Sequence, residues 1–122
     1  MSKILVVDDQ LEVRELMEVT LRSAGVKILK AASGEEAVDI ARKEKPDLII
    51  MDIMMPGKID GLEATRILKK DKQTSKILIL MLTAKGQKSD IEKGLDAGAN
   101  GYFTKPFSPL ELIEKVEELI NV

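Results

Sequence analysis

Short runs rich in apolar residues recur along the chain, and each is bounded by polar or turn-forming residues. Residues 48–51 (Leu-Ile-Ile-Met) and 77–82 are continuously apolar. Continuous rather than alternating apolar residues are typical of strands buried on both faces of a parallel sheet. The pattern predicts five strands, at residues 4–7, 26–31, 47–52, 77–82 and 101–104.

Between these runs the apolar residues recur every three to four positions, which indicates amphipathic helices. Ser33-Gly34-Glu35-Glu36 and Ser108-Pro109-Leu110-Glu111 match the capping box, in which a serine side chain accepts the backbone N–H three residues later. Gly25, Pro46 and Gly98 supply stops. The expected helices cover residues 10–24, 33–44, 62–70, 89–97 and 108–121.

The strict alternation of five strands with five helices, joined by short connections, predicts one doubly wound α/β domain. Its sheet is expected to be parallel and covered by helices on both faces. Ligands of such domains bind beyond the carboxyl ends of the strands, so a functional site is expected at that edge of the sheet.

Composition narrows the chemistry of that site. The 122 residues carry 19 Lys plus Arg and 21 Asp plus Glu, a net charge of −2 that argues against direct nucleic-acid binding. There is no Cys and no His, which excludes thiol nucleophiles, Ser-His-Asp chemistry and zinc fingers. The longest apolar run has six residues, far below the ~20 that span a bilayer. We therefore expect a cytoplasmic protein without a membrane-inserted segment.

Polar residues follow four of the predicted strands. Asp8 and Asp9 follow the first, Asp52 closes the third, Thr83 follows the fourth and Lys105 the fifth. Asp9 alone could serve only as a helix cap, but three carboxylates at neighbouring strand ends favour a site. Two carboxylates about 4 Å apart repel by roughly 4 kcal/mol at an effective dielectric near 20. Since one lysine offsets only part of this, we expect a divalent cation, Mg²⁺ or alternatively Mn²⁺.

The same residues stand in motifs that together resemble the receiver domain of response regulators in bacterial two-component signalling, including the chemotaxis regulators. The resemblance covers the whole chain. It implies a flavodoxin-like fold with strand order 2-1-3-4-5 and one receiver domain over residues 1–122, with no output domain. The motifs are Asp8-Asp9, Asp52-Ile53-Met54-Met55-Pro56, Asp60-Gly61, Thr83-Ala84, Ala97-Gly98-Ala99, Gly101-Tyr102 and Lys105-Pro106.

The resemblance implies that Asp52 is the nucleophile that accepts a phosphoryl group from a histidine kinase. Asp8, Asp9 and Asp52 would bind Mg²⁺ together with the backbone carbonyl of Met54. Attack by a carboxylate already ionised near neutral pH needs no general base, so the missing histidine is no obstacle. The activity expected is a signalling switch with self-catalysed phosphotransfer and autodephosphorylation.

Three further roles follow from the resemblance. Lys105 would pair with the phosphoryl oxygens, and its peptide bond to Pro106 would be cis. Thr83 would move toward the phosphoryl group, and Tyr102 would change rotamer with it. The partners implied are a sensor histidine kinase and an unidentified downstream protein, with a phosphorylation-dependent homodimer as a further option.

Several segments bear on switching and partner contact. Asp52 to Gly61 spans nine residues where the common family pattern has eight, and Gly57-Lys58-Ile59 carries the extra residue. Gly94 inside the fourth helix indicates either a weak, switchable element or close packing, with Ile91 and Leu95 as its main apolar anchors. Leu11 is expected to be exposed, opposite a buried first-helix stripe made of Val13, Leu16, Met17, Thr20 and Ala24.

Three other functions stay open on the residues alone. A receiver-like interaction module without phosphotransfer would have lost an acid or the lysine, and neither is lost. A phosphohydrolase with an aspartate nucleophile, of the haloacid-dehalogenase kind, places a second acid two residues later, where Met54 stands. A flavodoxin-like electron carrier or nucleotide binder needs a glycine-rich phosphate loop after the first strand, where two acids stand instead.

Overall fold

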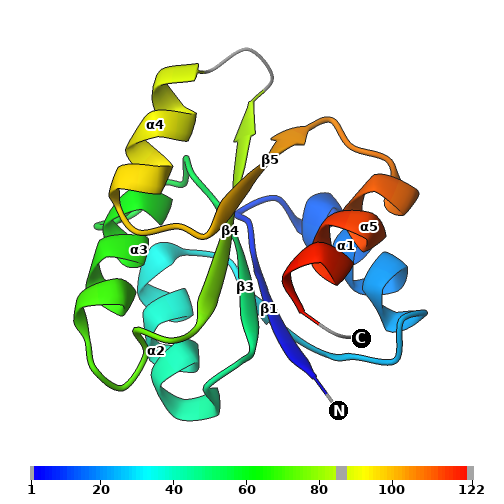
Figure 1. Ribbon diagram of the computed structural model, residues 1–122, viewed down its shortest axis with the longest axis horizontal. Helices are drawn as coiled ribbons and strands as arrows, with labels where there is room; N and C mark the ends of the chain where they lie inside the picture. Colours follow the sequence, from blue (N-terminus) through cyan, green and yellow to red (C-terminus); the bar gives the residue numbers. More distant parts are fainter. Residues whose placement is uncertain (1, 85–87, 121–122) are drawn as a thin grey trace.

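A computed structural model describes residues 2–84 and 88–120. Its five strands form one parallel sheet in the order β2-β1-β3-β4-β5, which confirms the predicted doubly wound α/β fold (Figure 1). The strands are β1 (Lys3–Val7), β2 (Lys27–Ala31), β3 (Leu48–Asp52), β4 (Leu78–Ala84) and β5 (Gly101–Lys105). The helices are α1 (Leu11–Arg22), α2 (Gly34–Glu44), α3 (Gly61–Lys70), α4 (Lys88–Asp96) and α5 (Pro109–Leu119).

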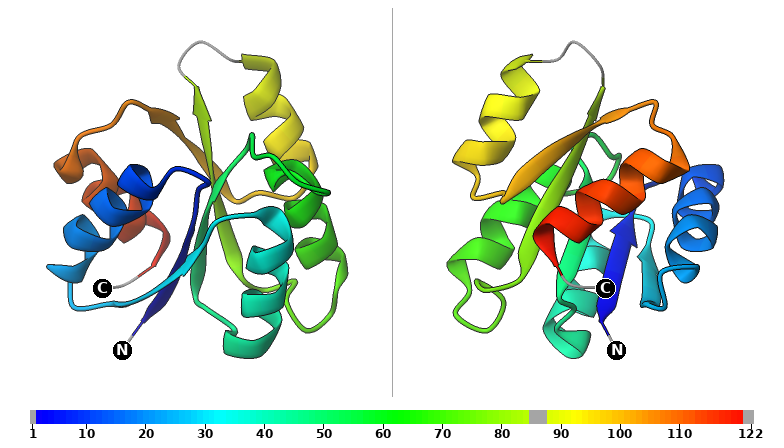
Figure 2. Two further views of the ribbon diagram at one scale, coloured as in Figure 1. Left: turned by 180° about the vertical axis from the view of Figure 1, so that it is seen from behind. Right: turned by 45° about the vertical axis from the view of Figure 1, so that its right-hand side comes forward.

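Two helical layers cover the sheet. Helices α2, α3 and α4 lie on one face, while α1 and α5 pack together on the other (Figures 1 and 2). Alternate residues of one strand enter different cores: Leu5 and Val7 face the α2–α3 layer, whereas Ile4 and Val6 face the α1–α5 layer. Both faces of β1 are therefore buried, which is the physical reason for its continuous apolar sequence.

The strand ends shift slightly from the prediction. Strand β4 begins one residue later and ends two residues later than expected, and β5 is extended by one residue. Pairing accounts for this, because Thr83 is opposite Thr104 and Ala84 is opposite Lys105 in the β4–β5 register. The hydrogen-bonded ladder thus carries two site residues on strands rather than on loops.

Both predicted serine caps are present. The Ser33 hydroxyl accepts the Glu36 N–H and the Ser108 hydroxyl accepts the Glu111 N–H, each at 3.2 Å. The Glu36 carboxylate accepts the N–H of Ala32, one residue before the cap, at 2.6 Å. These bonds satisfy helix-terminal donors that would otherwise lack partners.

Helix burial departs from the prediction at two leucines. Leu16, expected in the buried stripe of α1, is 43% exposed, and Leu21 is buried instead. Leu95, expected to anchor α4, is also exposed, whereas Gly94 is buried. A Cβ atom at Gly94 would lie 3.1 Å from the Met81 Cγ atom, so close packing against β4 explains the glycine. Leu11 is exposed, as expected.

No helix in residues 2–84 and 88–120 has the length and apolar character needed to cross a membrane.

Candidate functional site

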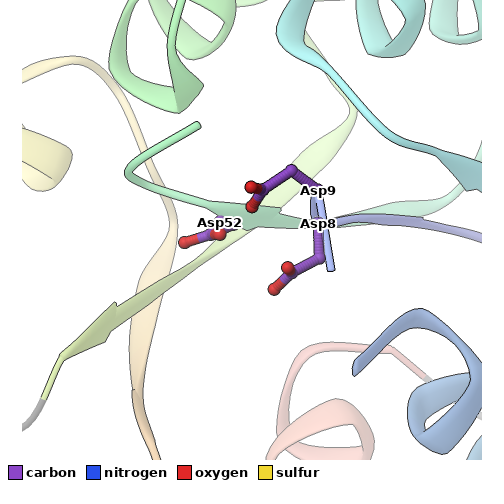
Figure 3. A group of neighbouring side chains, drawn as sticks. All are labelled: Asp8, Asp9 and Asp52. Atoms are coloured by element: carbon purple, nitrogen blue, oxygen red, sulfur yellow. The ribbon is translucent and has the colours of Figure 1, made fainter. Parts of the chain in front are cut away.

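Three carboxylates meet at the carboxyl edge of the sheet, where β1 and β3 end side by side. Asp8 and Asp9 follow β1, and Asp52 is the last residue of β3. One carboxylate oxygen from each lies within 4.8 Å of the others, and Figure 3 shows the side chains projecting toward the same side. Asp8 is fully buried and Asp52 is 7% exposed, while Asp9 is exposed. Parallel pairing of neighbouring strands therefore builds the acidic cluster directly.

Lys105, the last residue of β5, brings a positive charge to the two buried acids. Its ammonium donates to Asp8 Oδ2 at 2.7 Å and lies 3.5 Å from Asp52 Oδ2. The Lys105–Pro106 peptide bond is cis, as the resemblance implied. One lysine thus serves two buried carboxylates, which leaves an excess of negative charge among these three groups.

The carboxylate of Asp8 is held at both oxygens. Oδ1 accepts the N–H of Gln10 at 2.9 Å, and Oδ2 accepts from Lys105. The guanidinium of Arg14 donates to the Asp8 backbone carbonyl at 2.7 Å. These contacts anchor Asp8 to the start of α1 and to the end of β5.

The environment shifts the ionisation of Asp52. Its pKa is raised from 3.8 to about 6, because burial and, next, the charge of Asp8 raise it more than Lys105 and the hydrogen bond from the Met54 N–H lower it. Burial lowers the pKa of Lys105, but the hydrogen bond to Asp8 and the charge of Asp52 outweigh it, so the pKa of Lys105 is raised. Asp52 is thus mostly ionised at neutral pH, and Lys105 is protonated.

An open cleft borders two acids of this cluster, Asp9 and Asp52, while Asp8 lies buried beneath the surface. Asp9, Asp52, Met54 and Lys105 line the cleft together with Gln10 and Asp90. The N–H of Met54 donates to Asp52 Oδ1 at 3.4 Å, and the Met54 side chain is 66% exposed. Sequence reasoning missed Gln10 and Asp90, because neither ends a strand. Asp90 reaches the cleft from the first turn of α4.

Thr83 and Tyr102 occupy different positions from the cleft-lining residues. Thr83 is buried on β4, and its hydroxyl has no hydrogen-bond partner within the described residues. Tyr102 lies on β5 and is 42% exposed, beside Glu111 and Glu114 of α5 rather than in the cleft. A buried hydroxyl without a hydrogen-bond partner lowers the stability of the fold. A ligand oxygen near Thr83 would accept a hydrogen bond from this hydroxyl and remove that cost.

The donor set fits a small divalent cation. The carboxylate oxygens are hard ligands, and an open cleft leaves room for the waters that Mg²⁺ retains. Two buried acids share one lysine, and the pKa of Asp52 is raised first by burial and then by repulsion from Asp8. A cation bound among Asp8, Asp9 and Asp52 would offset that repulsion.

Comparisons with known proteins agree on one family. The family model described as the response regulator receiver domain matches residues 4–117. The phosphate regulon transcriptional regulatory protein PhoB of Pseudomonas aeruginosa is 44% identical over 118 residues, which cover 97% of this chain and 51% of PhoB. The chain spans about half the length of the curated relatives it matches.

Solved structures give the same result. A putative response regulator from Chloroflexus aurantiacus matches with a TM-score of 0.92 and 42% identity, covering 97% of this chain and 96% of that one. The receiver domain of sensor histidine kinase PA1611 from Pseudomonas aeruginosa, solved with a magnesium ion coordinated in its active site cleft, matches with a TM-score of 0.89 and 34% identity. That match covers 99% of this chain and 98% of the other.

Proposed function

The chain belongs to the response regulator receiver domain family, and we propose that Asp52 is its phosphoryl acceptor. In this proposal Asp52 takes the phosphoryl group from a phosphohistidine of a sensor histidine kinase, and phosphorylation changes the face that a downstream partner binds. Receiver domains interact with sensor histidine kinases, so the kinase is the donor that family membership supports.

One observation carries the proposal. Asp52 places a largely ionised carboxylate in an open cleft, 3.5 Å from the Lys105 ammonium and beside two further acids. The carboxylate is thus available as a nucleophile, and a cation stands where the oxygens of an incoming phosphoryl group would need one. An acid that served only as a helix cap would not need Lys105.

The reaction balances without a general base. An oxygen of the Asp52 carboxylate attacks phosphorus, and the bond between phosphorus and the kinase histidine nitrogen breaks. The electron pair of that bond stays on the imidazole, which leaves as the neutral ring when its other nitrogen carries a proton, and an acyl phosphate remains on Asp52. Lys105 is placed to pair with the charge that spreads over the phosphoryl oxygens, and the Thr83 hydroxyl, which has no partner among the described residues, offers a further donor.

Mg²⁺ is the cofactor we propose, held by Asp8, Asp9, Asp52 and the carbonyl of Met54. When bound, it supplies positive charge to the phosphoryl oxygens. Support comes from the hard oxygen donors of the cluster and from the magnesium ion in the PA1611 receiver domain.

We propose that Thr83 and Tyr102 form the switch. The Thr83 hydroxyl would turn to a phosphoryl oxygen on Asp52. Thr83 pairs with Thr104 in the β4–β5 register, and Tyr102 lies two residues before Thr104 on β5. Tyr102 would change its rotamer when Thr83 moves.

We propose that the kinase binds an exposed apolar surface next to the cleft. A groove between α1 and the segment that follows β5 is lined by Val13, Leu16, Ala84, Lys105, Pro106 and Phe107.

Intact mass after incubation with acetyl phosphate tests the proposal. With Mg²⁺, the chain should gain one phosphoryl group that hydroxylamine removes, as it does from acyl phosphates. Without Mg²⁺ or in Asp52→Asn, the gain should be lost. If the parent chain gains nothing under any condition, the phosphotransfer proposal is wrong and an interaction module remains.

A further inference from the structure

Two adjacent glutamates at the start of α2 have different partners. The Glu36 carboxylate accepts the N–H of Ala32 and closes the cap of its own helix. The Glu35 carboxylate instead reaches across to the loop between β3 and α3, where Oε1 accepts the N–H of Ile59 at 2.9 Å. The two residues are 24 positions apart in the sequence. Glu35 therefore tethers a different segment of the chain rather than its own helix.

The segment held by Glu35 is the one that carries the extra residue, Gly57-Lys58-Ile59. Gly57 has a φ of +118°, and a Cβ atom there would lie 3.2 Å from both carboxylate oxygens of Glu35. On the other side of the contact, a Cβ atom at Gly34 would lie 2.7 Å from the Ile59 carbonyl oxygen. The backbone at Gly34 and the carboxylate of Glu35 thus pack closely against residues 57–59 of the loop. A side chain at Gly34 or Gly57 would push these residues away from α2.

The same loop is fixed at its base beside Asp52. The N–H of Gly61 donates to the Ile53 carbonyl at 3.2 Å, and Gly61 packs directly on the Asp52 carbonyl. Between base and tether lies Met54, whose N–H donates to Asp52 Oδ1. Met54 and residues 57–59 therefore belong to one loop that is closed at its base by the Gly61–Ile53 bond and tethered at Ile59.

We infer that Glu35 is a positioning residue for the phosphorylation site: by binding the Ile59 N–H, it holds the long β3–α3 loop in the conformation that presents Met54 to the metal. This inference rests on the proposed function of the Asp52 site. Its test nevertheless reads metal binding and loop protection, which do not require phosphotransfer.

The experiment compares three variants. Glu35→Ala removes the acceptor, whereas Glu35→Gln keeps a side-chain oxygen of the same reach and should restore the bond. Glu36→Ala is the matched control, because it removes a cap bond from the same helix turn without touching the loop. Each is measured for Mg²⁺ affinity by titration calorimetry, for amide hydrogen exchange over residues 53–60 and for melting temperature.

We expect Glu35→Ala to weaken Mg²⁺ binding about three- to tenfold, the size of one lost hydrogen bond, and to speed exchange in the loop. Glu35→Gln should stay within about twofold of the parent, and Glu36→Ala should lower the melting temperature while leaving Mg²⁺ affinity within the same range. Parent-like Mg²⁺ affinity in Glu35→Ala would overturn the inference, as would an equal loss in Glu36→Ala. Failure of the parent chain to take up phosphate would count against the proposed function alone.

Discussion

The ammonium of Lys105 lies closer to Asp8 than to Asp52, at 2.7 Å against 3.5 Å. Asp8 is fully buried, so it depends on this lysine more than Asp52 does. The same lysine thus neutralises a proposed metal ligand while it stands within reach of the proposed phosphoryl acceptor.

Lys105→Met should therefore destabilise the chain most when no divalent cation is present. We expect a loss of about 2 kcal/mol in EDTA, because a buried carboxylate loses its partner while the side chain of Lys105 is itself partly exposed. Saturating Mg²⁺ should shrink the loss, since the cation replaces the missing charge. Urea unfolding in both buffers measures this. Lys115→Met, which removes a surface pair with Glu118, should cost less than about 1 kcal/mol in either buffer.

Asp52→Asn should stabilise the metal-free chain. The pKa of Asp52 is raised from 3.8 to about 6 in the folded state, so the native state binds more protons than the unfolded state between these values. Stability therefore falls as the pH rises through this window, by up to about 3 kcal/mol for a shift of this size. Asp52→Asn does not titrate and so escapes that loss. Its free energy of unfolding should exceed that of the parent by the full amount above pH ~7, and the difference should vanish below pH ~4.

Unfolding curves of Asp52→Asn and the parent in EDTA across this pH range provide the measurement. Asp39→Asn, at an exposed position of α2, serves as the control and should differ from the parent by less than about 0.5 kcal/mol. An advantage of Asp52→Asn that is the same at every pH would contradict the raised pKa.

Most of the fold could be predicted because the apolar runs match fully buried parallel strands. Asp8, Asp52 and Lys105 could be located for the same reason, since the carboxyl ends of parallel strands share one edge. These three residues meet at that edge because of the sheet topology, so their proximity can be predicted without knowing the paths of the loops.

The contacts that sequence reasoning missed depend on loop paths and helix rotation. Nothing in the sequence pairs Glu35 with Ile59, because that contact joins an α2 carboxylate to a loop whose path is set by Gly57 and Gly61. The apolar spacing of α1 places Leu16 in the predicted core, because this helix carries apolar residues on several sides. The orientation of α1 about its axis turns Leu21 toward the core and leaves Leu16 exposed.

Thr83→Val should not destabilise the unphosphorylated chain. The buried Thr83 hydroxyl has no partner within the described residues, so removing it loses no hydrogen bond there, and stability should rise by up to about 1 kcal/mol. Thr74→Val is the contrasting control, because that buried hydroxyl donates to the Leu68 carbonyl at 2.7 Å, and its loss should cost about 1–2 kcal/mol. Thermal unfolding compares the two variants.

The same pair of variants separates folding from switching. Beryllofluoride with Mg²⁺, a mimic of the phosphoryl group, should raise the melting temperature of the parent and of Thr74→Val by similar amounts. It should raise that of Thr83→Val less, since the mimic finds no hydroxyl there. An equal rise in all three proteins would remove Thr83 from the proposed switch.

Gly61→Ala tests the close approach between α3 and the backbone of the proposed acceptor. A Cβ atom at Gly61 would overlap the Asp52 carbonyl oxygen, and a backbone atom cannot swing away as a flexible side chain can. We expect a loss of at least about 3 kcal/mol, because the start of α3 must move away from β3. Gly25→Ala is the matched control: Gly25 has a φ of +76° but open space around its Cβ position, so only backbone strain of about 1–2 kcal/mol applies. Urea unfolding of the two variants measures both losses. If Gly61→Ala loses no more stability than Gly25→Ala, α3 does not pack on the Asp52 carbonyl, and the base of the loop held by Glu35 is not fixed there.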